Sequence, residues 1–191
     1  MTILTRFLIM MIVAISLGAG ATYLMVDQGQ RISAIAMGPW FAWPNLGTPD
    51  GDPYSAARQA RTGQLPLGAS EGIAFFAETD SQNAPLDGTC TYVIDGQTPP
   101  ARLWTLAAYE ADGGLKNHEA DKYSLDSREI VRRTDGSFEI TVSGKARPGN
   151  WLPLGGRSSL VLVLRLYDTP LTTGSGQGNY SMPKVTRGAC P

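Results

Sequence analysis

The stretch SFEITVS at residues 137–143 alternates between polar and apolar side chains without a break. A period of two places Phe138, Ile140 and Val142 on one face of an extended chain and the polar residues on the other. The stretch therefore predicts a strand with one face against a core. Farther along, residues 159–167 read SLVLVLRLY, a nearly continuous apolar run that is typical of a central strand.

Three other runs predict strands, at residues 73–77, 91–94 and 102–109, and each is followed by Asp or Gly residues that suit turns. The 22 glycines and 13 prolines, with only 17% charged residues, suit short strands joined by tight turns. We therefore expect an all-β domain over residues 51–191, a jelly-roll-like β-sandwich with one short helix, preceded by a transmembrane helix.

The one helix expected in this domain covers residues 52–63. Asp52 can accept hydrogen bonds from the first free amides, and Pro53 suits the first helical position. Gly63 is placed where a left-handed residue ends many helices. These residues predict a short, capped helix ahead of the strands.

The N-terminus is apolar: residues 7–26 read FLIMMIVAISLGAGATYLMV, with no charge. A helix of this length spans about 30 Å, the thickness of the hydrocarbon layer. Residues 1–27 are therefore predicted to be a single-pass inner-membrane anchor. Arg6 directly precedes this stretch, and the preference of basic residues for the cytoplasmic side places the N-terminus in the cytoplasm and the domain in the periplasm. The alternative is a signal peptide cleaved after Ala21, which would also export the domain.

Residues 28–50 form an aromatic segment close to this anchor. Trp40, Phe41 and Trp43 are predicted to rest at the membrane interface, where aromatic rings are enriched. The alternative, which the sequence leaves open, is that they are the first packing residues of the domain.

Cys90 and Cys190 are the two cysteines of the chain. An exported domain meets an oxidising environment, so we expect them to form a disulfide. It would close a loop of about 100 residues. By lowering the entropy of the unfolded chain, it would stabilise the fold by roughly 4–5 kcal/mol.

The sequence offers few residues for catalysis. His118 is the only histidine, and a polar loop surrounds it. The glycine-rich residues 174–178 lack the Gly-Lys-Ser/Thr ending of a phosphate loop. No metal site and no cofactor are expected. With 16 basic and 17 acidic residues, the chain lacks the positive field that nucleic acid requires. The scarcity of catalytic residues argues against an enzyme, but the sequence leaves that question open.

Charged and aromatic side chains inside the apolar strands are the remaining candidates. An arginine in a buried strand needs a partner, because an unpaired buried charge costs several kcal/mol. We expect Arg165 to pair with Asp168 or Glu71. The alternative is a polar pocket near Trp104, Trp151 and Arg165 that would suit a sugar or an acid. The candidate ligand-binding residues are Glu71, Arg102, Trp104, Trp151, Arg165 and Tyr167.

Three phrases resemble one known family: ARLWTL at residues 101–106, GNWLP at 149–153 and LVLRLYDTP at 162–170. The sequence is similar there to the domain-of-unknown-function family 1214, in its short membrane-anchored bacterial branch. The resemblance implies a jelly-roll-like domain, often encoded beside a partner from family 1254, and it supplies no reaction. In larger relatives the two domains pack together in one chain.

These observations predict an interaction or assembly module of the bacterial envelope. Its expected partners are the lipid bilayer and a protein, either a family-1254 protein or a second copy of the chain. The alternative is a small-ligand binder or enzyme that uses the pocket described above.

Overall fold

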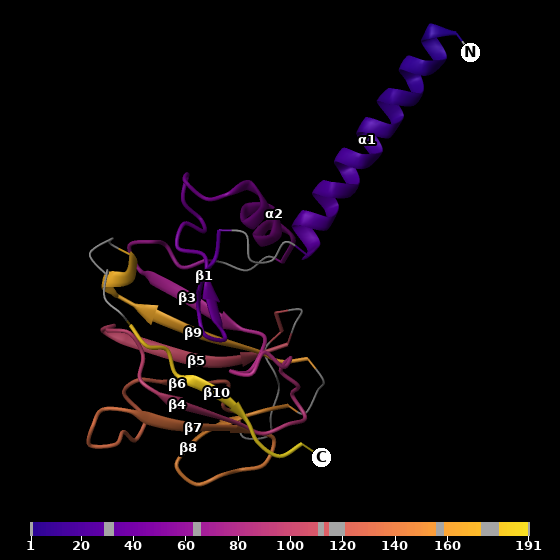
Figure 1. The fold of residues 1–191 in the computed structure, drawn as a ribbon. Coiled ribbons are helices and arrows are strands. Elements are labelled where there is room, and N and C mark those ends of the chain that lie inside the picture. The colour runs from indigo at the N-terminus through magenta and orange to yellow at the C-terminus, as the bar shows by residue number, and fades with distance from the viewer. Residues whose placement is uncertain are drawn as a thin grey trace.

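A computed structural model describes residues 2–28, 33–62, 66–110, 113–114, 121–155, 159–172 and 180–190. Figure 1 shows a long N-terminal helix that leads into a domain of two sheets. In chain order the elements are α1 (Ile3–Gln28), β1 (Ile35–Met37), β2 (Trp40–Ala42), α2 (Pro53–Thr62), β3 (Gly72–Ala77), β4 (Tyr92–Gly96), β5 (Leu103–Tyr109), β6 (Ser124–Asp126), β7 (Phe138–Ser143), β8 (Asn150–Pro153), β9 (Val161–Tyr167), the 3-10 turn η1 (Pro170–Thr172) and β10 (Lys184–Arg187).

The strands form a β-sandwich, as the sequence predicts. One sheet has six strands in the order β1-β2-β3-β9-β5-β6, and the other has four in the order β10-β4-β7-β8. The five predicted strands are confirmed as β3, β4, β5, β7 and β9. Among the described strands, neighbours are antiparallel except β7 and β8.

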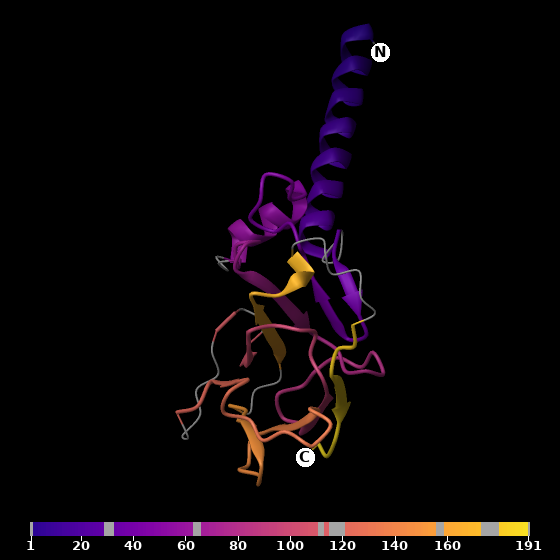
Figure 2. The ribbon, with the colours of Figure 1, turned by 90° about the vertical axis from the view of Figure 1, so that its left-hand side faces the viewer.

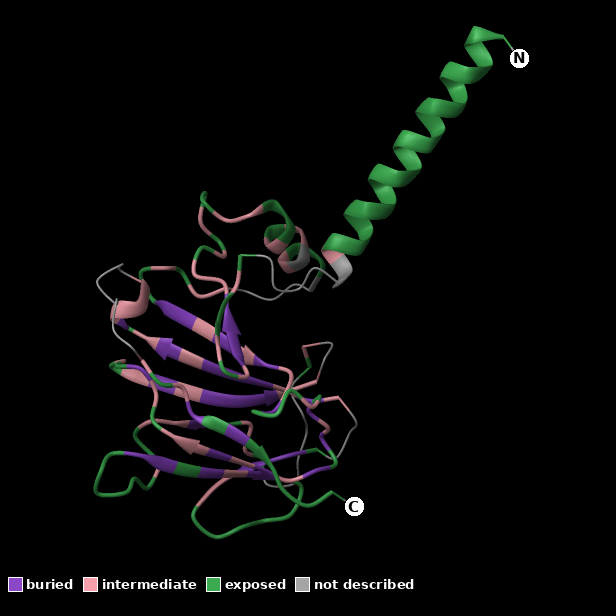
Figure 3. Cartoon of the chain, viewed as in Figure 1, coloured by how far each residue is buried: buried purple, intermediate pink, exposed green. Residues whose placement is uncertain are grey.

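Alternate residues of the strands fill the space between the sheets. Phe138, Ile140 and Val142 are at most 1% exposed and belong to the core, as their period of two indicates. In β9 the inward residues are the leucines, and Arg165 lies on the opposite face. Figure 3 shows the buried residues concentrated along the strands of both sheets.

Helix α2 begins as expected. The Asp52 carboxylate accepts hydrogen bonds from the backbone N–H groups of Tyr54 (3.0 Å) and Ser55 (2.9 Å). Burial alone would raise the pKa of Asp52, but the hydrogen bonds from Ser55, Tyr54 and Ser33 together lower it. The predicted stop, Gly63, lies outside the described residues.

Helix α1 projects away from the sandwich in both views (Figures 1 and 2). Its segment Ile3–Val26 is 24 residues long, has a mean hydropathy of 2.1 and has no buried residue. A helix of this length and composition can cross a bilayer. This segment is therefore a single-pass anchor or a signal sequence.

The parallel pair β7–β8 has an unusually short connection, residues 144–149. Parallel neighbours usually need a crossover of a dozen or more residues. Side chains close the base of this loop. The indole N–H of Trp151 donates to the Ser143 backbone oxygen and hydroxyl, both at 3.1 Å, and that hydroxyl donates to the Lys145 oxygen at 2.7 Å. Trp151 therefore holds the turn that places β8 at the sheet edge.

The disulfide joins Cys90 to Cys190, with Cα atoms 4.1 Å apart. Backbone hydrogen bonds extend the link toward β10: Thr91 N–H donates to the Ala189 oxygen, and Gly188 N–H donates to the Thr91 oxygen, both at 2.8 Å. The disulfide thus fastens the end of the chain to the start of β4.

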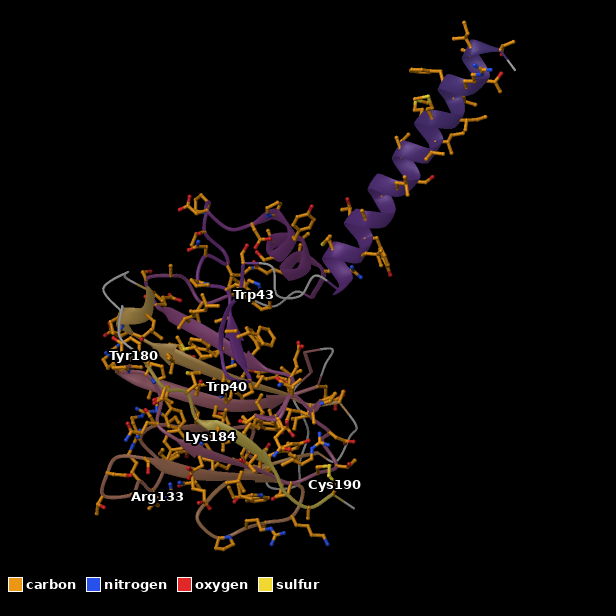
Figure 4. The ribbon with its side chains drawn as sticks, viewed as in Figure 1. Trp40, Trp43, Arg133, Tyr180, Lys184 and Cys190 are labelled. Carbon is orange, nitrogen blue, oxygen red and sulfur yellow. A yellow bond between two sulfur atoms is a disulfide. The ribbon has the colours of Figure 1, made fainter. Side chains whose placement is uncertain are left out.

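The aromatic segment before residue 51 contributes two strands to the six-stranded sheet. Trp40 is 0% exposed and Phe41 is 2% exposed, both in β2. The indole N–H of Trp40 donates to the backbone oxygen of Pro183 at 2.7 Å. Figure 4 shows Trp40 within the sandwich and Trp43 nearer α2. Trp40 and Phe41 are thus packing residues, so the sheet begins before the boundary expected at residue 51.

We expect Trp40→Phe to lower the free energy of unfolding by about 2 kcal/mol, because the buried Pro183 oxygen loses its donor. Thermal unfolding of the full-length protein in mild detergent measures the loss. Trp151→Phe is the matched control, with an expected loss below about 1 kcal/mol, since the Ser143 backbone oxygen still accepts from the Leu154 N–H at 3.0 Å. Equal losses in the two variants would contradict this reading.

Candidate interaction surface

The outer face of the six-stranded sheet carries the side chains that the core does not use. Phe41, Phe76, Val163 and Arg165 all lie on this face, because they alternate with core residues along β2, β3 and β9. We call this surface, with Trp43, Thr105, Tyr109 and Tyr167, the outer face.

Three aromatic rings form one corner of the outer face. Phe41 and Trp43 meet edge to face with centroids 5.3 Å apart, and Phe76 stacks on Phe41 at 6.0 Å. Trp43 and Phe76 are 5.9 Å apart. Such contacts stabilise beyond the area they bury. The ring of Phe76 is half-buried, so this corner remains partly open to solvent.

Arg165 links the neighbouring strands β9 and β5 on the outer face. Its guanidinium donates to the Tyr109 hydroxyl at 3.1 Å and lies 5.4 Å from the centre of that ring. In the register, the pair Val163–Ala107 lies between these two residues. Val163 and Ala107 are 3% and 4% exposed. The bridge therefore helps to cover the middle of the sheet.

Neither of the expected carboxylate partners of Arg165 is paired with it. Asp168 forms its ion pair with Arg102 at 3.2 Å, and both side chains are largely exposed. Glu71 is exposed in the turn before β3. The prediction that one of them pairs with Arg165 is wrong. Strand alternation places Arg165 on the outer face, where its guanidinium contacts Tyr109 on the neighbouring strand β5 and, within the described residues, neither of these carboxylates.

Four of the six sequence-predicted ligand residues nevertheless come together at one end of this sheet. Asp168 N–H donates to the Glu71 oxygen at 2.9 Å, and Arg102 N–H donates to the Tyr167 oxygen at 3.1 Å. Arg165 follows on the same face of β9, two residues before Tyr167.

Trp104 and Trp151 lie elsewhere. Trp104 points into the core, where its ring is 5.0 Å from that of Phe138 and below the guanidinium of Arg132. Trp151 alternates with core residue Leu152 and lies on the outer side of the four-stranded sheet. The structure therefore does not bring Trp104, Trp151 and Arg165 into one pocket.

The outer side of the four-stranded sheet is charge-compensated, unlike the outer face. The two terminal guanidinium nitrogens of Arg133 (labelled in Figure 4) contact Asp95 and Glu139, each at 2.6 Å. Its hydrogen bond with Asp95 raises the pKa of Arg133. Hydrogen bonds from Ser137 lower the pKa of Asp135 beside it.

Within the described ranges, no three His, Cys, Asp or Glu residues group as a metal site would require. His118 and Glu119 lie outside these ranges, as do residues 174–178. Sequence reasoning missed Phe76 and Tyr109. The signal was present, because each alternates with a core residue in a predicted strand.

The fold defines an all-β sandwich domain with an N-terminal apolar helix. Residues 71–171 match a family described as "Protein of unknown function (DUF1214)". Because the match covers more than half of the chain, the protein belongs to this family, as the sequence phrases indicate.

Two solved structures resemble the chain. The VPA0106 protein from Vibrio parahaemolyticus matches with 20% identity and a TM-score of 0.61, covering 91% of this chain and 43% of its own. A putative uncharacterized protein from Burkholderia cenocepacia matches with 19% identity and a TM-score of 0.41, covering 64% and 31%. The Vibrio likeness shows the fold, and the chain spans less than half of that protein. No curated protein matches the chain.

Proposed function

We propose that this protein is a membrane-anchored domain of the bacterial envelope that binds another protein through its outer face. The observation that carries the proposal is the composition of that face. Trp, Tyr, Phe and Arg are the side chains enriched at protein interfaces, and Trp, Tyr and Arg dominate their binding energy. Here Trp43, Phe76, Tyr109 and Arg165 lie on one side of one sheet.

The proposed location is the periplasmic side of the inner membrane. The exposed apolar helix supports an anchor, and a disulfide supports an oxidising compartment. Arg6 precedes the apolar stretch and supports a cytoplasmic N-terminus.

The proposed partner is a family-1254 protein or a second copy of the chain. The family resemblance, which implies paired domains in larger relatives, supports the first. The chain spans only 43% of the Vibrio protein, which leaves room there for a second domain. An interface of biological size would bury at least about 1,000 Å².

The test compares two outward-facing threonines in central strands. Thr105 lies on the outer face in β5, and Thr141 lies on the outer side of the other sheet in β7; both are half-buried. We expect the full-length protein in mild detergent to form a complex with a co-expressed family-1254 protein or with itself, measured by light scattering. Thr105→Arg should reduce the complex to the monomer, and Thr141→Arg should not.

A monomeric wild-type protein without a bound partner would contradict the proposal, as would equal effects of the two variants. A monomer that bound a small acid or sugar at Arg165 would favour the ligand-binding alternative.

A further inference from the structure

Arg165 lacks a carboxylate partner among the described residues. Arg102, Arg128, Arg133 and Arg187 each have a carboxylate oxygen within 4 Å, and Arg132, which has none in the described residues, is exposed. For Arg165, the described residues provide only the neutral hydroxyl and ring of Tyr109. The Arg165 residue is also half-buried, so its guanidinium has lost part of its hydration.

A partly desolvated cation is stabilised most by an anion. A guanidinium pairs with a carboxylate through strong, often two-point hydrogen bonds. Tyr109 already holds one guanidinium nitrogen, which fixes the direction of the others and lowers the entropy lost on binding. The outer face thus presents a preorganised cation whose charge its own sheet leaves uncompensated.

The apolar corner and Arg165 lie on neighbouring strands at a backbone spacing set by the register. Phe76 pairs with Val163 across β3 and β9, and Arg165 is two residues beyond Val163. The Cα atoms of Phe76 and Arg165 are therefore about 8 Å apart, from the spacing of strands and of alternate residues. In an extended peptide, side chains two residues apart project to the same side at about 6.7 Å.

We infer that the partner protein presents an Asp or Glu carboxylate to Arg165 and an apolar side chain, two residues away, to Phe76. This inference rests on the proposed function and specifies the chemistry of the bound segment: an extended, acidic and apolar stretch of a protein. The carboxylate supplies the hydrogen bonds that the guanidinium lost with its water. The apolar side chain packs against the part of the Phe76 ring that is open to solvent.

The experiment places a photo-crosslinking amino acid at Ser124 in the full-length protein, in cells that produce it at native levels. Ser124 is exposed on β6 at the rim of the outer face, in register with Ala107. We expect a crosslinked peptide that contains Asp or Glu with an apolar residue two positions away. Arg165→Glu should lower the crosslink yield at least tenfold, and changing the partner's acidic residue to Arg should restore it.

Arg147→Glu is the matched control, because Arg147 is exposed in the loop after β7 on the other sheet, and it should leave the yield unchanged. Near-UV circular dichroism of each variant checks that it is folded. If Arg165→Glu proves unfolded, Arg165→Gln takes its place, with an expected fall of at least fivefold.

The outcomes separate the inference from the proposed function. A crosslink that persists in a folded Arg165 variant, or a peptide without a carboxylate, would overturn the inference and leave a protein interface at the outer face. The absence of any crosslink from Ser124 would overturn both.

Discussion

Gly72→Ala is expected to abolish cooperative folding of the domain or to destabilise it by more than about 4 kcal/mol. A Cβ atom on Gly72 would lie 2.0 Å from the backbone oxygen of Leu166 and 3.0 Å from the Cα of Tyr167. These are backbone atoms of the partner strand, so no side-chain rotation relieves the clash. Gly72 is the first residue of β3, and it pairs with Tyr167, the last residue of the neighbouring central strand β9. The added methyl would force these strands apart.

The yield of folded full-length protein and its urea unfolding midpoint measure this effect. Gly68→Ala is the control, because the nearest atoms to its Cβ belong to the flexible Glu71 side chain at 3.7 Å or more. We expect this control to change stability by less than about 1 kcal/mol. A Gly72→Ala protein as stable as the control would show that β3 and β9 do not pair in this register.

Loss of the disulfide is expected to have the second largest effect. Replacing Cys90 and Cys190 together by alanine removes a crosslink between residues 100 positions apart, so the unfolded chain gains conformational entropy. The chain-entropy model assigns about 4.7 kcal/mol to such a loop. For a domain of this size, 1 kcal/mol corresponds to roughly 2–4 °C, so the Tm should fall by about 10 °C or more. Thermal unfolding by circular dichroism measures the shift.

Three further proteins complete this experiment. Cys190→Ser alone and the reduced wild type should unfold close to the double variant, since all three lack the same crosslink. The oxidised wild type should show no free thiol in non-reducing peptide mapping. Recovery of two free thiols would show that the disulfide does not form, and a double variant with an unchanged Tm would show that it does not stabilise the fold.

Much of the architecture follows from local patterns. Phe138, Ile140 and Val142 are core residues because a strand alternates its side chains wherever it lies. Asp52 caps α2 because its carboxylate reaches the N–H groups of its own next turn. The membrane-length helix depends only on consecutive apolar residues. Each of these features involves residues near one another in the chain.

The candidate surface is less readable from the sequence. The expectation that Arg165 lies in a pocket with Trp104 and Trp151 treats nearby apolar strands as one site. In the structure, Trp104 faces inward and Arg165 outward in neighbouring strands, while Trp151 belongs to the other sheet. One residue of register decides which face a side chain occupies.

Local sequence patterns are enough to assign the strand periods, the apolar helix, the family and the two cysteines available to pair. The packing of distant segments is needed to make Trp40 a core residue hydrogen-bonded to Pro183, to place β3 beside β9, and to put Arg165 on the same face as Phe76. The difference arises from separation along the chain. Secondary structure depends on neighbours a few residues apart, whereas strand order and register arise from packing between segments far apart in the sequence.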